Sequence, residues 1–164
     1  FIRASKVPVV IVLDNIRSQN NTGSIFRTAD AFRLEGIFLC GITATPPHRE
    51  IQKTALGSTE SVQWRYFTTT MDAIGYLQME GYTLIAVEQT RNSVLLQDFK
   101  PEKDQKYALV FGNEVNGVGE AELEQCNFVL EIPQYGTKHS LNVAVSVGIV
   151  IWGIISSGVF SGTL

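Results

Sequence analysis

Short apolar runs rich in β-branched residues alternate along the chain with segments whose apolar residues recur at helical spacing. The run at 8–13 (PVVIVL) is continuous, which is typical of a strand covered on both faces. Runs of this kind and weaker ones predict strands over 8–13, 36–40, 62–67, 82–87, 107–111 and 128–132. Helical spacing predicts helices over 20–32, 49–56, 70–79, 120–125 and 140–156. The polar segment 91–106 is expected to be a loop.

Strands that alternate with helices predict an α/β fold with a mostly parallel sheet and helices on both faces. The most apolar stretch, 141–155, is short and interrupted by polar residues and glycines, which favours a buried helix over a membrane span. Neither a repeat nor a linker divides the sequence, so we expect a single domain over residues 1–164. The chain begins at Phe1 and not at methionine, which leaves room for a further N-terminal segment.

The composition is that of a globular protein, with 45% apolar and 18% charged residues. A net charge of -3 argues mildly against nucleic-acid binding, although an acidic protein can still carry a basic patch. Neither Cys40 nor Cys126 has the spacing of a metal ligand, and Cys40 ends an apolar run that predicts a buried thiol. This use of cysteine suggests a reducing compartment, and we expect a cytoplasmic protein.

Ligands of open α/β sheets bind beyond the carboxyl ends of the strands, so the segments after the predicted strands are the candidate sites. The first is the segment 20–27 (NNTGSIFR). Asn20 and Arg27 are seven residues apart and share one face of a helix. An arginine near a helix start can bind phosphate or stabilise a hydroxyl group that is losing its proton. The simpler alternative is a capping asparagine with a surface arginine.

The second candidate segment is 111–119 (FGNEVNGVG). A glycine after a strand allows either a positive φ or the close approach of a ligand, and Glu114 could orient an arginine or bind a ligand amine. An ordinary turn rich in asparagine and glycine explains the segment equally well. It lacks the GKS/T ending of a phosphate-binding loop and the GxGxxG pattern of a dinucleotide site.

The third candidate segment is 132–144, which leads into the apolar C-terminal helix. Ser140 is expected to be its N-cap, with Asn142 in the first helical turn. Polar residues at this place often frame a pocket, although they also suit a capped core helix. The only histidines, His48 and His139, have no second histidine or paired carboxylate nearby, so no metal site is expected.

Together, the three segments resemble the motifs of a known family. The order N-x-G-x-x-x-R-T-A from Asn21, F-G-N-E-x-x-G from Phe111, and I-P…S-L-N-V-A from Ile132 is similar to that of the TrmH branch of the SPOUT methyltransferases. The resemblance covers residues 9–155. It implies a deep trefoil knot near the C-terminus that holds S-adenosylmethionine. It also implies a homodimer with the site at the subunit interface and the C-terminal helix partly buried there.

The resemblance further implies which residues bind the cofactor. Backbone groups of Gly112, Ile132 and Leu141 should hold the adenine and the ribose, and the end of the strand at Val87 and Glu88 should form another wall. The full set of expected cofactor-binding residues is Val87, Glu88, Gly112, Asn113, Gly117, Ile132, Leu141 and Asn142.

The catalytic set that the resemblance implies is Arg27, Asn21, Glu114, Ser140 and Asn142. Arg27 should orient the ribose 2′-hydroxyl and stabilise charge, since a guanidinium is a poor base. Asn21 and Glu114 should position that arginine or the substrate. Ser140 and Asn142 should line the pocket near the reacting methyl group, and no metal is needed.

The implied function is methyl transfer from S-adenosylmethionine to a ribose 2′-hydroxyl of tRNA or rRNA. A SPOUT enzyme that methylates a base is an alternative, but that branch typically uses an aspartate base and lacks this arginine. A non-catalytic RNA-binding protein that retains the fold is another, although it should have lost motif residues that are present here. An unrelated nucleotide-binding enzyme is disfavoured by the missing phosphate motifs. Candidate contacts to RNA phosphates are Arg17, Arg33, Arg49, Lys53 and Lys138.

Overall fold

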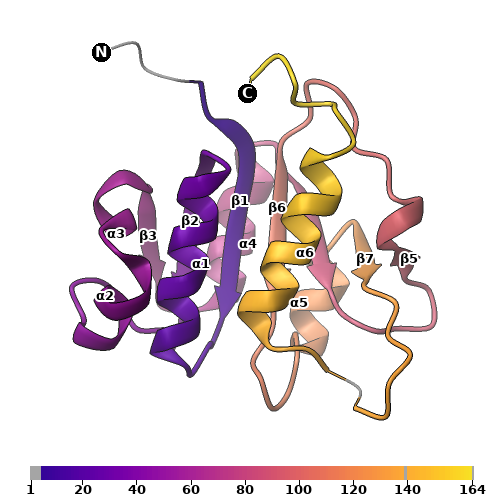
Figure 1. The fold of residues 1–164 in the computed structure, drawn as a ribbon. Coiled ribbons are helices and arrows are strands. Elements are labelled where there is room, and N and C mark those ends of the chain that lie inside the picture. The colour runs from indigo at the N-terminus through magenta and orange to yellow at the C-terminus, as the bar shows by residue number, and fades with distance from the viewer. Residues whose placement is uncertain (1–4, 139, 164) are drawn as a thin grey trace.

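The computed structural model describes residues 5–138 and 140–163 and contains a sheet of seven strands, all of them parallel (Figure 1). The strand order is β3-β2-β1-β6-β4-β7-β5. The strands are β1 (Val7–Asp14), β2 (Leu34–Cys40), β3 (Trp64–Phe67), β4 (Thr83–Val87), β5 (Val94–Leu95), β6 (Tyr107–Phe111) and β7 (Phe128–Glu131). The helices are α1 (Gln19–Ala31), α2 (Arg49–Ala55), α3 (Ser58–Ser61), α4 (Thr70–Met79), α5 (Glu120–Gln125) and α6 (Val143–Ile155), with a 3-10 turn, η1 (Leu96–Asp98).

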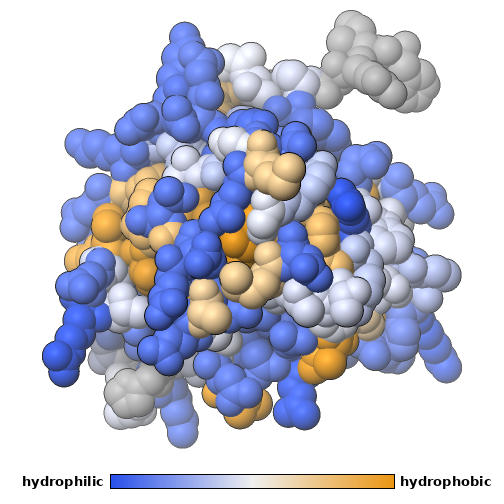
Figure 2. Space-filling view, turned by 180° about the vertical axis from the view of Figure 1, so that it is seen from behind, coloured by the Kyte–Doolittle hydropathy of each residue, from blue (hydrophilic) through white to orange (hydrophobic). Residues whose placement is uncertain are grey.

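Helices cover both faces of the sheet, as the alternation of elements predicts (Figure 1). Successive residues of a strand point to opposite faces, so β1 contributes Val9 and Ile11 to one hydrophobic cluster and Val10 and Val12 to the other. The first cluster also includes α1, α2 and α6, and the second includes α4 and α5. Seen from the side of α4 and α5, the surface is mostly hydrophilic, with apolar groups showing between polar side chains (Figure 2). A strand with two buried faces has to be apolar throughout, which explains the continuous run at 8–13.

The segment predicted to be a loop at 91–106 contains the short edge strand β5 and the turn η1. Only Val94 and Leu95 pair with β7, at Leu130 and Glu131. Two residues are too few to show an alternating pattern, and the position of β5 at the sheet edge depends on β7 being in place. The four-residue helix α3 was missed for the same reason of length.

The helix N-caps also differ from those predicted. Ser18 and not an asparagine caps α1, through a bond from the Asn21 backbone N–H to the Ser18 hydroxyl of 3.1 Å. Asn142 and not Ser140 caps α6, where its side-chain oxygen accepts the backbone N–H groups of Ala144 and Val145. Both serine and asparagine are good caps, so the sequence alone does not choose between neighbouring candidates.

The register of the central strands brings their carboxyl ends side by side. Leu13 of β1 and Val87 of β4 both pair with Phe111 of β6, and Val87 also pairs with Leu130 of β7. The loops that follow β1, β4, β6 and β7 therefore meet at one edge of the sheet. The predicted trefoil knot concerns how loops pass one another, which strand pairing does not describe, and it stays a prediction.

Both cysteines are free thiols, and Cys40 is buried as the sequence predicts. Cys40 is fully buried at the end of β2, and Cys126 is half-buried; both are free. Burial raises the pKa of the Cys40 thiol to about 12. Within the described ranges, no helix has the length and apolar character needed to cross a bilayer.

Candidate functional site

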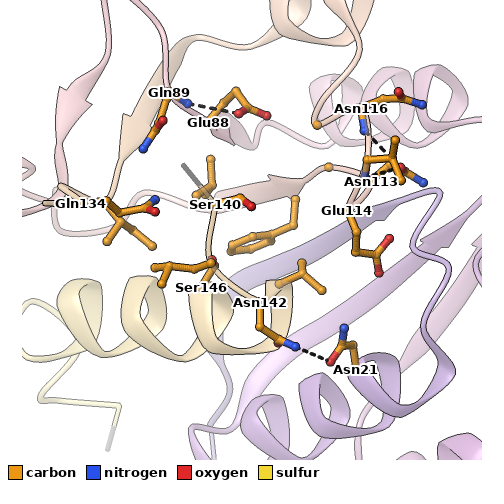
Figure 3. A pocket seen from close by; sticks show the side chains of 18 residues that line it. Asn21, Glu88, Gln89, Asn113, Glu114, Asn116, Gln134, Ser140, Asn142 and Ser146 are labelled. Carbon is orange, nitrogen blue, oxygen red and sulfur yellow. Dashed lines mark hydrogen bonds between the residues drawn. The ribbon is translucent and has the colours of Figure 1, made fainter. Parts of the chain in front are cut away.

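A cavity of about 550 Å³ opens where the loops after β1, β4, β6 and β7 meet. Its wall is formed by residues far apart in the sequence, with one side made by the start of α6 (Figure 3). The lining residues are Asn21, Val87, Glu88, Gln89, Phe111, Gly112, Asn113, Glu114, Val115, Asn116, Gly117, Ile132, Gln134, Ser140, Leu141, Asn142, Val143 and Ser146. The volume is within the range of about 300–1,000 Å³ that small-molecule sites occupy.

With the exception of Arg27, every residue that the sequence nominated for the site lines this cavity. Arg27 lies on α1 with its side chain exposed, nearly two turns of helix beyond Asn21. Six residues of α-helix advance about 9 Å and rotate the side chain to a different face, so the two residues of the first motif point in different directions. The lining residues that the sequence did not predict are each within four residues of a predicted one; they are Gln89, Phe111, Val115, Asn116, Gln134, Val143 and Ser146.

The glycine at the end of β6 is required by the chain's own backbone. A Cβ atom at Gly112 would lie 2.1 Å from both the Gly117 carbonyl carbon and the Val118 nitrogen. Gly112 does not have a positive φ, whereas Gly117 does, at +68°. The loop 112–118 thus folds back onto its own beginning, and this allows Asn113 and Glu114 to project from a tight turn.

Asn113 holds the second motif against the loop after β1. Its side-chain amide donates to the Asn15 carbonyl at 2.6 Å, and its side-chain oxygen accepts the backbone N–H groups of Val115 and Asn116. Its own carbonyl accepts the Gly117 N–H at 2.8 Å. The side chain is therefore occupied by contacts within the protein, and these fix the shape of one wall of the cavity.

Glu114 joins the second motif to the start of the first. Its two carboxylate oxygens accept the backbone N–H groups of Arg17 and Ser18, at 3.2 and 3.4 Å. These donors directly precede α1, where backbone N–H groups have no partner within the helix. The carboxylate thus satisfies both donors and adds negative charge at the edge of the cavity.

Glu88 ties the loop after β4 to the second motif. Its carboxylate accepts the Val118 N–H at 3.0 Å and the Gln89 N–H at 3.2 Å. A Cβ atom at Gly117 would lie 2.4 Å from a carboxylate oxygen of Glu88, so only glycine leaves room for this contact. The carboxylates of Glu88 and Glu114 both border the cavity (Figure 3).

Asn142 connects the third motif to the first. Its side-chain nitrogen donates to the side-chain oxygen of Asn21 at 3.1 Å, while its oxygen caps α6 (Figure 3). The cap uses the acceptor half of the amide and the contact to Asn21 uses the donor half. A carboxylate has no donor for Asn21, and a hydroxyl would have to make both contacts from a single oxygen atom. The amide makes them from two separate atoms, which gives a physical reason for asparagine at this position.

Comparison with known proteins agrees with this arrangement. The profile of the SpoU rRNA methylase family matches residues 8–152. The chain belongs to the SpoU rRNA methylase family. The resemblance to the TrmH branch is thereby confirmed, and relatives of the chain include a protein named as a putative TrmH family tRNA/rRNA methyltransferase from Staphylococcus saprophyticus, 26% identical over 149 residues, which cover 91% of this chain and 59% of that protein.

Two further relatives carry more specific names. One is the 23S rRNA (guanosine-2′-O-)-methyltransferase RlmB of Neisseria meningitidis serogroup B, 29% identical over 147 residues, or 90% of this chain and 58% of the relative. The other is a crystal structure of an AdoMet-bound rRNA methyltransferase from Sinorhizobium meliloti, with a TM-score of 0.84 and 28% identity over 99% of this chain and 59% of that one. The chain therefore spans about six tenths of the length of these SpoU relatives.

Proposed function

We propose that this SpoU-family domain transfers a methyl group from S-adenosylmethionine to a ribose 2′-hydroxyl of tRNA or rRNA. The observation that carries the proposal is that the three motif segments form one cavity and are hydrogen-bonded to one another. Glu114 contacts the residues before α1, and Asn142 contacts Asn21. The names of the relatives, which include a guanosine-2′-O-methyltransferase and an AdoMet-bound enzyme, support the same reaction.

The cavity has chemistry that suits S-adenosylmethionine. Ile132, Leu141 and Val143 offer apolar surface for the adenine, and the backbone of the 112–117 loop offers polar groups. The carboxylates of Glu88 and Glu114 favour a cationic ligand, and their remaining lone pairs can accept hydroxyl or ammonium donors. When bound, the cofactor supplies an electrophilic methyl group on a positively charged sulfur.

The protein's own contribution is mainly positioning, since direct displacement at a methyl carbon needs the two reacting atoms held in line. Asn21, Ser140 and Asn142 line the side of the cavity next to α1 and would orient the acceptor ribose there. Glu114 would keep the start of α1 in place through the Arg17 and Ser18 N–H groups. The Arg27 guanidinium would orient the 2′-hydroxyl and stabilise the oxygen as its proton leaves.

Because Arg27 does not line the cavity of its own chain, we propose that a second copy of the chain supplies it. The exposed side of α6 carries an apolar stripe of Val145, Ile149 and Trp152, which are 51%, 37% and 60% exposed. Their spacing of four and three residues places them on one face of the helix. Burial of this stripe in a homodimer would bring the exposed surface of α1, which packs beside α6, toward the partner's cavity (Figure 1).

The first experiment is a calorimetric titration with S-adenosylmethionine and S-adenosylhomocysteine, followed by a transfer assay on unmodified tRNA and rRNA with detection of 2′-O-methylribose by mass spectrometry. Arg27→Ala should abolish transfer and leave cofactor affinity unchanged, while Arg91→Ala, at another exposed arginine, should behave as wild type. Loss of cofactor binding in Arg27→Ala would contradict the role given to Arg27. Methylation of a base with an unmethylated ribose would contradict the proposed reaction.

Mixing of two variant subunits tests whether Arg27 is supplied by the second copy of the chain. In a mixed dimer of Arg27→Ala and Asn142→Ala chains, one site would combine an intact cavity with an intact arginine from the partner. We expect the mixture to recover activity that neither variant has alone. Two inactive variants that stay inactive when mixed, although they form mixed dimers, would place Arg27 in the site of its own chain.

A further inference from the structure

A second cavity, of about 430 Å³, lies at the carboxyl ends of β1 and β2. The loop 113–117 separates it from the first cavity, and Asn113, Val115, Asn116 and Gly117 line both. The Asn116 side chain points away from the first cavity (Figure 3). The second cavity thus begins on the opposite side of the wall that the second motif forms.

Two apolar side chains that line the second cavity are exposed to solvent. Ile42 is 63% exposed and Val115 is 70% exposed, and both lie in turns at the edge of the sheet. The position of Ile42 is fixed, because its backbone N–H donates to the Asn15 side chain at 3.0 Å. Apolar side chains held at the mouth of a cavity can pack against the flat faces of a nucleobase.

Two charged side chains that line this cavity, Arg17 and Glu122, can still form hydrogen bonds with a ligand. In the parts of the chain that the structure describes, neither the Arg17 guanidinium nor the Glu122 carboxylate forms a hydrogen bond or an ion pair. Glu122 is half-buried, and one of its carboxylate oxygens would lie 2.1 Å from a Cβ atom at Gly119. Asp14, which is only 5% exposed, accepts hydrogen bonds from Thr70 and Asn15.

These features narrow the class of ligand. A metal ion is disfavoured, because no group of three potential metal ligands occurs among residues 5–138 and 140–163. A free anion would meet the carboxylates of Asp14 and Glu122. A nucleotide fits better, since its base can donate to a carboxylate and pack against apolar side chains while its phosphate meets Arg17. Guanine is favoured among the bases, because its N1–H and N2–H groups are adjacent donors that one carboxylate can accept together.

We propose that the second cavity holds a guanine of the substrate RNA, next to the nucleotide that is methylated, with Glu122 as the group that recognises the base. This inference rests on the proposed RNA methyltransferase function. It adds a base-recognition site to a reaction whose acceptor is a ribose, which itself carries no sequence information.

The test uses the chain with methyl-labelled isoleucine and valine, saturated with S-adenosylhomocysteine, and follows the Ile42 and Val115 methyl signals by nuclear magnetic resonance. Guanosine, adenosine, cytidine and uridine monophosphates are added in separate titrations. We expect guanosine monophosphate to shift both signals in a saturable way and to bind at least tenfold more tightly than the other three. Glu122→Gln should weaken the binding of guanosine monophosphate about tenfold and so abolish the preference, because it replaces one acceptor oxygen with a donor. Glu124→Gln, on the same helix but outside the cavity, is the matched control.

Equal shifts with all four nucleotides, or a guanine preference that survives in Glu122→Gln, would overturn the assignment. So would the absence of any shift at Ile42 and Val115. Binding of S-adenosylhomocysteine, measured in the same samples, separates this inference from the proposed function. If S-adenosylhomocysteine binds and guanosine monophosphate does not, only the second site is refuted. If S-adenosylhomocysteine does not bind, the methyltransferase assignment itself fails.

Discussion

Replacement of Gly112 by alanine tests the geometry of the second motif directly. The new Cβ atom would lie 2.1 Å from the Gly117 carbonyl carbon and the Val118 nitrogen. Since non-bonded carbon atoms settle at about 3.5–4.0 Å, the backbone at 117–118 would have to retreat by more than about 1 Å. Such a shift would break the 3.0 Å bond from the Val118 N–H to Glu88 and the 2.8 Å bond from the Gly117 N–H to the Asn113 carbonyl.

The expected loss of folding stability can be estimated from these contacts. Two hydrogen bonds contribute about 1 kcal/mol each, and overpacking adds about 1–3 kcal/mol. We therefore expect Gly112→Ala to lower the free energy of unfolding by about 3–5 kcal/mol and to weaken S-adenosylhomocysteine binding at least tenfold. Urea unfolding followed by tryptophan fluorescence and calorimetric titration measure the two effects.

Gly136→Ala is the matched control, because a Cβ atom at Gly136 would have no other atom within 4 Å and the residue is not among the glycines with positive φ. It should change neither stability nor cofactor affinity beyond about 0.5 kcal/mol. The prediction fails if the free energy of unfolding of Gly112→Ala lies within about 0.5 kcal/mol of the wild-type value and its cofactor affinity is normal. The loop 112–118 would then not approach its own start closely in solution.

Three further predictions follow from other contacts. Asn142→Ala should lower stability by about 1 kcal/mol through loss of the α6 cap and should weaken cofactor binding; unchanged affinity in calorimetry would remove Asn142 from the site. Gly23→Ala should destabilise by about 1–3 kcal/mol in urea unfolding, because its Cβ would lie 2.3 Å from the Ile51 carbonyl oxygen on α2, and a neutral effect would show that α1 and α2 pack less closely. Burial raises the pKa of the Cys40 thiol from 9.0 to about 12, so the folded chain retains a proton that the unfolded chain loses; stability should be fully present below pH 9 and fall between pH 9 and 12. Cys40→Ala should make this alkaline decline shallower, and an unaltered slope would exclude Cys40 as its source.

The secondary structure could be predicted from the sequence wherever one physical signal dominates. The strand at 8–13 is buried on both faces, so its continuous apolar run was sufficient, and the helix at 70–79 has a strong stop signal at Gly81. The signal is weaker where two neighbouring residues can play the same part. Ser140 and Asn142 are both competent N-caps, and in the structure Asn142 caps α6 and also donates to Asn21.

The candidate site was predicted largely through the order of the three motifs, since each segment alone has an ordinary structural explanation. Gly112, Glu114 and Asn142 line one cavity, and the hydrogen-bond partners of Glu114 and Asn142 are 96 to 121 residues away, so no local pattern shows why these two residue types are needed. Only the packed backbone shows that Gly112 makes room for its own loop.

The sequence by itself determined the parallel α/β arrangement, the core strands and the family, because hydrophobic periodicity is a property of neighbouring residues and the order of the motifs can be read along the chain without knowing the fold. The tertiary structure decided what depends on distant parts of the chain meeting. It joined Asn21 to Asn142, left Arg27 outside the cavity of its own chain, and placed Arg17, Ile42 and Glu122 around a second cavity. The loops of separate segments meet at one edge of the sheet because of the register of β1, β2, β4 and β6.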